Sequence, residues 1–152
     1  MAVKSARGIN LEQGEVITLK ASSAVGATAG TNGTAVPILG ERRRYIFILS
    51  VTAAATEVTD TLDVYVDWSF DDATYYNGGH FTQCLGNGGA KKYFMVFDPS
   101  NPGTSVIDVT SDAANSTVRP ALFGAYVRAR WVEVDPGGGA SSFTFSVIGY
   151  AL

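Results

Sequence analysis

Residues 60–69 show the clearest pattern in the chain, a strict alternation of apolar and polar positions. The apolar positions are Leu62, Val64, Val66 and Trp68, and the positions between them are Asp63, Tyr65 and Asp67. Because successive side chains of a strand point to opposite faces of a sheet, this spacing predicts a strand with one buried and one solvated face. The polar segment that follows, residues 70–80, is expected to form a loop or a hairpin tip.

Similar strand patterns recur along the chain, separated by turns rich in Gly, Pro and Asn. Together they predict about eight strands, over residues 15–21, 42–52, 60–69, 81–85, 91–97, 105–110, 125–134 and 142–150. No segment repeats its apolar residues with the period of a helix, about 3.6 residues. The pattern is therefore typical of an all-β fold, an antiparallel β-sandwich or jelly roll, with a barrel as the remaining alternative.

The strand predicted over residues 42–52 is apolar on both faces. Ile46 and Ile48 lie on the face opposite Tyr45, Phe47 and Leu49. An apolar run of this kind indicates a central strand that is covered on both sides. The largest aromatic side chains are expected to form the core, and they are Phe47, Trp68, Trp131, Phe143 and Phe145.

Two segments fall outside the strand pattern. Residues 1–13 are predicted to form an N-terminal arm, and residues 14–152 a single β-sandwich domain. Residues 22–40 are rich in Ala, Gly, Ser and Thr, which predicts a long loop or an arm that lies on a neighbouring subunit. Loops of this length usually have a function or are mobile. Contact with a neighbouring subunit would be such a function, so the segment favours an assembled state.

Composition narrows the classes of partner. The chain has 152 residues, of which 46% are hydrophobic and only 16% charged, with a net charge of −3. A surface poor in charge favours coverage by a partner, and an acidic balance argues against direct binding of nucleic acid. The apolar runs are too short to span a membrane, and the first residues lack the apolar core of a signal peptide. We therefore expect the protein to fold in a cytoplasm.

The reactive residue types are too few for most catalytic or metal sites. Cys84 is the only cysteine and His80 the only histidine, which excludes an internal disulfide and a Cys/His zinc cluster. A nucleophile paired with a base could only be Cys84 with His80. A buried thiol and a histidine hydrogen-bonded at a strand edge are the simpler interpretation. The sequence thus predicts no enzymatic activity and no cofactor.

One acidic group raises the question of a cation. Its members are Asp60, Asp63, Asp67, Asp71 and Asp72. Several carboxylates close together could bind calcium, but the glycine-containing twelve-residue loop of the best-known calcium motif is missing. A solvated strand face followed by a turn is the favoured interpretation, and the cation remains an open alternative.

Seven residues are candidates for contact with a partner, namely Arg42, Arg43, Arg44, Tyr75, Tyr76, Arg128 and Arg130. The basic run at residues 42–44 could pair with an acidic subunit or, less simply, with nucleic acid. Arg128 and Arg130 share one strand face and could pair with acids across an interface. Tyr75 and Tyr76 lie in the expected loop, where aromatic rings could stack on a sugar.

Strand and turn motifs between residues 60 and 150 resemble those of small structural proteins of tailed bacteriophages. The segments that carry the resemblance are residues 66–75, 80–83, 86–93, 119–124, 127–131 and 143–147. The resemblance implies a non-enzymatic virion component and supplies no catalytic residues.

Head decoration, or cement, proteins are the first class that this resemblance implies, and neck or tail components are the second. The implied partners are the major capsid protein or other virion subunits, and further copies of the chain, with a trimer preferred. The expected location is the virion, assembled in the host cytoplasm. A carbohydrate-binding β-sandwich module is the alternative from another class, because of Tyr75 and Tyr76.

Overall fold

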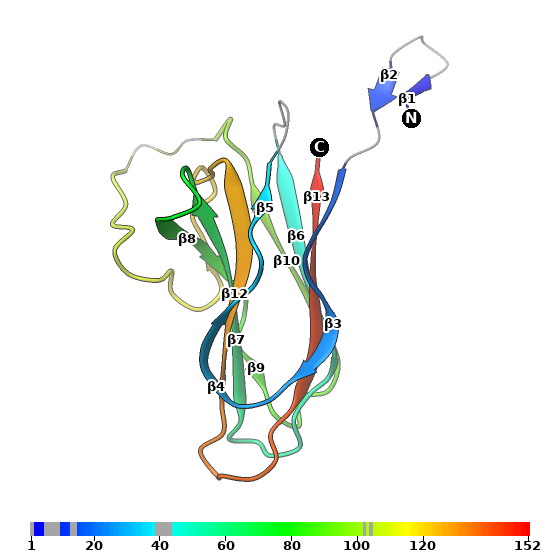
Figure 1. Ribbon diagram of the computed structural model, residues 1–152, viewed down its shortest axis with the longest axis vertical. Coiled ribbons are helices and arrows are strands. Elements are labelled where there is room, and N and C mark those ends of the chain that lie inside the picture. Colours follow the sequence, from blue (N-terminus) through cyan, green and yellow to red (C-terminus); the bar gives the residue numbers. More distant parts are fainter. Residues whose placement is uncertain (1, 5–9, 13–14, 39–43, 102, 104) are drawn as a thin grey trace.

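Two antiparallel sheets face each other in the computed structural model (Figure 1). The structure describes residues 2–4, 10–12, 15–38, 44–101, 103 and 105–152, and these ranges contain no helix. The chain is therefore an all-β sandwich, as its sequence pattern predicts. Within the described ranges, nothing has the length and hydrophobicity of a bilayer-crossing helix.

The first sheet has four strands in the order β10-β6-β13-β3. Their bounds are Lys91–Phe97 for β10, Tyr45–Ala53 for β6, Phe143–Ala151 for β13 and Glu15–Val25 for β3. Strand β6 lies between β10 and β13, as expected of a central strand. Its second face is not fully covered, however, because Ile46 and Ile48 are only half-buried.

The second sheet has seven strands. Its main path runs β11-β8-β7-β12-β4, and β5 and β9 pair with β12 and β7. The bounds are Thr117–Val118 for β11, Tyr75–His80 for β8, Thr61–Ser69 for β7, Tyr126–Val134 for β12, Thr28–Asn32 for β4, Val36–Pro37 for β5 and Cys84–Leu85 for β9. A separate pair, β1 (Ala2–Lys4) with β2 (Asn10–Glu12), stands off the sandwich in Figure 1.

Trp68 joins the two sheets at the centre of the core. It belongs to β7, and its ring meets the edges of Tyr45, Phe47 and Phe97 at centroid distances of 5.3, 5.9 and 5.3 Å. All three of these rings belong to the other sheet. A Cβ on Gly78 would lie only 2.6 Å from Trp68 Cδ1, so this position of β8 has no room for a side chain. The predicted core aromatics are all buried.

Four of the expected elements are wrong. Residues 22–40 are not one long loop, since β3 continues to Val25 along β13, and β4 and β5 pair with β12. Residues 75–80 are a strand rather than a hairpin tip. Only two of residues 81–85 form a strand. Residues 105–110 form none; Val106 and Ile107 are exposed, and Asp108 instead accepts a hydrogen bond from the backbone N–H of Thr110.

Candidate functional site on the outer sheet faces

The outer face of the four-stranded sheet is apolar toward one end, and it becomes polar in the next row, where Lys92, Ser50 and Ser146 lie in register. In register across its strands, one row runs from Val96 through Ile46 and Tyr150 to Val16, and the next from Phe94 through Ile48 to Ile148. Phe94 is 73% exposed and Val16 59%. We call these seven residues the apolar face. A contiguous apolar patch of this kind marks a contact surface more often than isolated exposed residues do.

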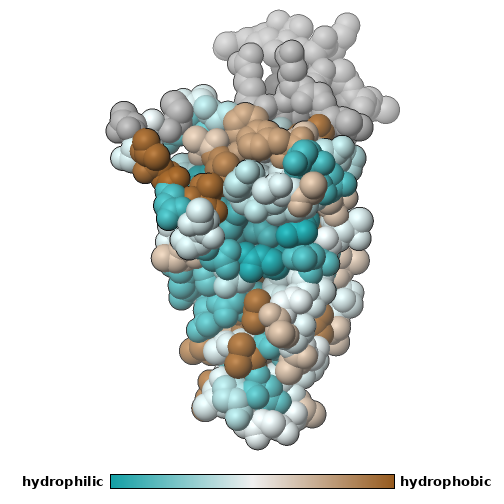
Figure 2. All heavy atoms as spheres, turned by 60° about the vertical axis from the view of Figure 1, so that its left-hand side comes forward, coloured by the Kyte–Doolittle hydropathy of each residue, from teal (hydrophilic) through white to brown (hydrophobic). Residues whose placement is uncertain are grey.

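The outer face of the seven-stranded sheet is polar and centred on Asp67. Arg130 Nε donates a hydrogen bond of 2.9 Å to Asp67 Oδ2, and Arg128 Nε lies 3.6 Å from the same oxygen. Asn77 Nδ2 donates to the other oxygen at 2.9 Å. Asp67 is only 3% exposed, so its charge is balanced inside the chain. Figure 2 shows hydrophilic residues in a band across the middle of the molecule on this side.

The two arginines also stack on tyrosines. The Arg128 guanidinium lies 3.6 Å from the centroid of Tyr75, and that of Arg130 lies 4.1 Å from Tyr65. Burial and the hydrogen bond that the Tyr75 hydroxyl donates to Asp72 raise the pKa of Tyr75 to about 12. Because the Arg128 guanidinium stacks on Tyr75, one face of the Tyr75 ring is already covered by a cation.

A segment between β10 and β11 is fastened over this polar face. Arg130 Nη2 donates to Asp112 Oδ1 at 2.5 Å, and the backbone N–H of Ala113 donates to Asn77 Oδ1 at 2.8 Å. Arg119 bridges the same region, because its Nη1 donates to the Asn77 carbonyl at 2.7 Å and its Nη2 to the Ser111 carbonyl at 2.9 Å. The polar groups of the face thus bind mainly one another.

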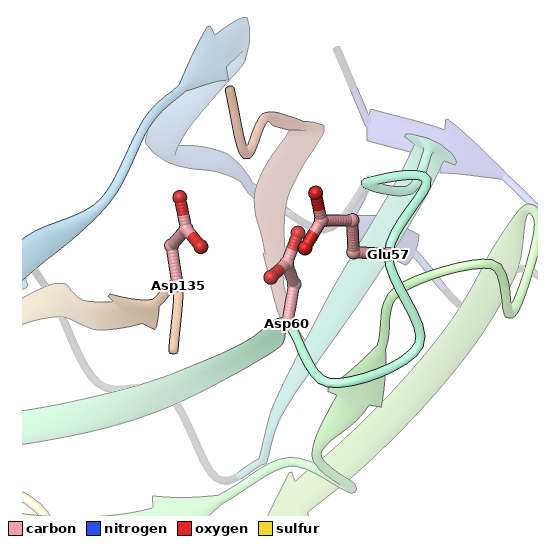
Figure 3. A group of neighbouring side chains, drawn as sticks. All are labelled: Glu57, Asp60 and Asp135. Carbon is pink, nitrogen blue, oxygen red and sulfur yellow. The ribbon is translucent and has the colours of Figure 1, made fainter. Parts of the chain in front are cut away.

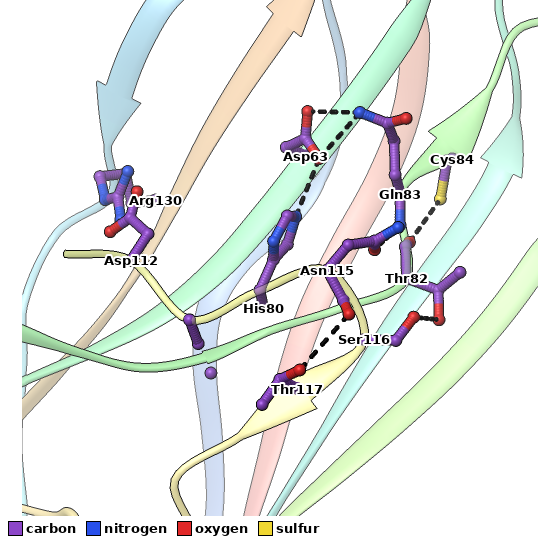
Figure 4. A network of polar contacts seen from close by, with 12 residues as sticks. Asp63, His80, Thr82, Gln83, Cys84, Asp112, Asn115, Ser116, Thr117 and Arg130 are labelled. Atoms are coloured by element: carbon purple, nitrogen blue, oxygen red, sulfur yellow. Dashed lines mark hydrogen bonds and ion pairs between the residues drawn. The ribbon is translucent and has the colours of Figure 1, made fainter. Parts of the chain in front are cut away.

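His80 belongs to a second polar cluster on the same sheet (Figure 4). Its Nε2 donates to Asp63 Oδ1 at 2.8 Å, because a carboxylate can only accept, and its ring stacks on Tyr65 at 4.2 Å. Gln83 Nε2 donates to Asp63 Oδ2 at 2.9 Å. Burial alone would raise the pKa of Asp63, but these hydrogen bonds and the charge of His80 lower it overall. His80 is thus a hydrogen-bonded strand residue.

Cys84 is not paired with His80. Its Sγ contacts the Thr82 carbonyl at 3.7 Å, and burial raises the pKa of the thiol to about 11. A thiol with such a pKa is almost wholly protonated at neutral pH and is a poor nucleophile. Its place in the core agrees with the structural role that the sequence favours.

The seven predicted contact residues do not form one site. Tyr75, Arg128 and Arg130 gather around Asp67, whereas Tyr76 pairs with Trp68 and therefore lies on the opposite, core-facing side of β8. Arg44 directly precedes β6 in the other sheet and pairs with Asp98 at 2.9 Å. Arg42 and Arg43 fall outside the described residues. The apolar face was not predicted from sequence, although Ile46 and Ile48 on the second face of β6 were a signal for it.

The five aspartates of the sequence pattern separate as well. Asp63 and Asp67 belong to the polar face, and Asp71 accepts turn hydrogen bonds from Ala73 and Thr74. Asp72 adopts a left-handed backbone conformation, with φ of 59°. Of the five, Asp60 is the one that belongs to a group of three close carboxylates in the described part of the chain, with Glu57 and Asp135.

The sandwich is similar in fold to parts of two solved virus structures. A structure of the infectious bursal disease virus Gx strain matches all of this chain with a TM-score of 0.54 and 11% identity, over 36% of its own chain. The VP2 subviral particle of infectious bursal disease virus matches 92% of this chain with a TM-score of 0.51 and 11% identity, over 32% of its own. This chain thus spans about a third of either structure's chain, and the likeness is one of fold. No protein-family model and no curated protein matches the sequence.

Proposed function

We propose that the protein is a non-enzymatic structural component of a virion, and that it is a decoration protein of a tailed-phage head. The observation that carries the proposal is the apolar face, since a patch of exposed apolar residues on a sheet marks a surface that a partner protein buries. The sandwich fold in virus-particle structures and the resemblance to phage structural proteins give this face its expected partner.

Shell stabilisation follows from burial of this face. Removing apolar surface from water contributes roughly 25 cal/mol per Å². Specific interfaces bury about 800 Å² on each partner, and a flat sheet face suits contact across the joint between two shell subunits. A protein that covers such joints raises the cost of separating the subunits. Its partners are then the major capsid protein and further copies of itself, with a trimer as the expected oligomer.

The N-terminal arm is the second expected contact. Strands β1 and β2 have three residues each and pair with each other. An isolated two-stranded hairpin is marginal in water, so we expect it to gain a further partner in the assembled particle. Deleting residues 1–13 should abolish particle binding and leave the sandwich folded, which co-sedimentation and circular dichroism would measure. Unchanged binding would remove the arm from the proposal.

The decisive experiment is a count of copies per particle by quantitative mass spectrometry of purified virions. Hundreds of copies, on the outside of the head by imaging, would support a decoration protein. About a dozen copies or fewer would indicate a closed ring at the neck or tail, the second candidate. Absence from virions would overturn the virion role.

A carbohydrate-binding module is less well supported, because Arg128 covers one face of Tyr75. A glycan array that compares the wild-type chain with the variants Tyr75→Ala and Tyr76→Ala tests this alternative. Glycan binding that both substitutions abolish would favour the module over a virion component.

A further inference from the structure

Three carboxylates converge at one end of the sandwich. Glu57 lies in the connection from β6 to β7, Asp60 directly before β7 and Asp135 directly after β12. One oxygen from each lies within 4.8 Å of the others. Figure 3 shows the three side chains pointing toward a common space from two separate loops.

Two buried oxygens at this end have no hydrogen-bond partner in the described part of the chain. Asp60 is 1% exposed, and its Oδ1 is unpaired. Glu133 is 2% exposed; its Oε1 accepts a hydrogen bond from the Ser141 hydroxyl, but its Oε2 is unpaired. Buried polar atoms are nearly always satisfied, since an unpaired buried carboxylate oxygen is strongly unfavourable. A group that the protein chain does not supply is therefore expected here.

The charge at this end is also unbalanced. Among the described residues, no Lys, Arg or His forms an ion pair with Glu57, Asp60, Glu133 or Asp135. This contrasts with Asp67, whose two arginines balance it. Like charges at such short range repel one another unless a cation or a proton separates them.

The surrounding backbone is fitted closely to Glu57. A Cβ on Gly137 would lie 2.4 Å from Glu57 Oε2, and one on Gly139 would lie 2.6 Å from Glu57 Oε1. The loop after β12 therefore passes directly against the Glu57 carboxylate. The backbone N–H of Gly138 donates to Asp135 Oδ1 at 2.7 Å, which holds that side chain in the same loop.

We propose that Glu57, Asp60 and Asp135 bind one Ca²⁺ per chain. The donors are all oxygens, which suit a hard cation; the soft or nitrogen ligands that zinc and copper prefer are missing from the group. Ca²⁺ accepts an irregular shell of six to eight oxygens, so backbone carbonyls and water can complete it, whereas Mg²⁺ demands a strict octahedron. This site shares only Asp60 with the acidic group that the sequence suggested.

The ion would fasten the two sheets together. The connection that carries Glu57 runs from β6 in the four-stranded sheet to β7 in the seven-stranded sheet, and the loop of Asp135 runs back from β12 to β13. Both crossings are at the same end of the sandwich. Binding only to the folded chain raises stability in proportion to the logarithm of ion concentration. The site is independent of the virion role, so either proposal can fail without the other.

The test uses the full-length protein, stripped with EDTA and titrated with CaCl₂ or MgCl₂ by isothermal calorimetry, with melting temperature as a second readout. We expect one Ca²⁺ per chain, a melting temperature that rises with Ca²⁺, and a weaker response to Mg²⁺. Glu57 is exposed, so E57Q keeps the fold and should weaken Ca²⁺ binding about tenfold or more, since ligand charge sets affinity. D60N and D135N should remove the Ca²⁺-dependent rise.

D108N is the matched control, because Asp108 is an exposed carboxylate that accepts hydrogen bonds from Thr110, and the substitution removes the same charge. It should keep the full response to Ca²⁺. No binding heat and no rise for the wild-type chain would overturn the proposal and indicate carboxyl groups that share protons. An undiminished response of E57Q and D135N would overturn it equally.

Discussion

The two outer faces of this sandwich have opposite chemistry. On the seven-stranded sheet, Asp67 is balanced by two arginines and an amide, and a chain segment is fastened across it. On the four-stranded sheet, Phe94 and Val16 are exposed with apolar neighbours in register. Arg128 and Arg130 were predicted from sequence to contact a partner, yet their charges are balanced within the chain by Asp67 and Asp112. Burial against a partner would therefore be most favourable for the apolar face.

Breaking the Asp67 cluster should have the largest effect on stability. Asp67→Ala removes the carboxylate that accepts from Arg130 Nε and Asn77 Nδ2 in a nearly buried setting, and leaves them only Asp112 and the Gly79 carbonyl. Removing one partner of a buried ion pair typically costs about 3–5 kcal/mol. Urea unfolding of the isolated protein would measure this loss. The control is Asp108→Ala, an exposed carboxylate, and equal midpoints for both variants would show that the cluster is not stabilising.

Changing the apolar face should affect assembly rather than folding. Phe94→Ser removes the most exposed aromatic of that face, so the midpoint of unfolding should stay near that of the wild type. Binding to particles or to further copies should weaken about tenfold or more, as for a hot-spot aromatic. Co-sedimentation and mass photometry would measure it. Val106→Ser, fully exposed outside the face, is the control and should bind normally.

A pH titration would show how far the polar face contributes to folding. The pKa of Asp63 is lowered in the folded chain, so its contribution is complete above its unfolded pKa, about 3.9. The contribution is lost as the pH falls through the lower, folded value. Asp63→Asn should therefore flatten stability against pH in that acidic range, measured as melting temperature. Gln83→Ala, which removes one donor, should flatten it less.

The smallest effect is expected for the solvated ion pair. Arg44 Nη2 lies 2.9 Å from Asp98, but the Arg44 side chain is 55% exposed. Water and salt screen such pairs, and many contribute nothing measurable. Arg44→Ala should leave the melting temperature within experimental scatter. A loss of stability as large as that of Asp67→Ala would mean that burial does not explain the difference in strength between the two ion pairs.

Regular alternation made much of the fold predictable. The buried positions of β7, β12 and β13 follow the sequence pattern, because each strand has one face toward the core. Strand β8 was missed since Asn77-Gly78-Gly79 is typical of turns; here Gly78 leaves room for Trp68. Strands β4 and β5 lie along β12 through backbone bonds, which small polar side chains do not reveal.

The sites were less predictable because they depend on segments distant in sequence. Glu57 and Asp135 meet only because two crossings between the sheets lie at the same end. Val106 and Ile107 have the residue types of a strand, but they lack a partner strand in the described chain. The apolar face needed the register of four strands, so no single segment could show its extent.

The position of Trp68 makes it an intrinsic fluorescence reporter of the contact between the two sheets. Its three aromatic neighbours all belong to the opposite sheet, and its indole Nε1 has no hydrogen-bond partner in the described chain. An indole so placed emits at short wavelength, and its emission moves to the red when water reaches the ring. A Trp131→Phe variant would leave this single emitter. Its spectrum would then follow the separation of the sheets in the free chain.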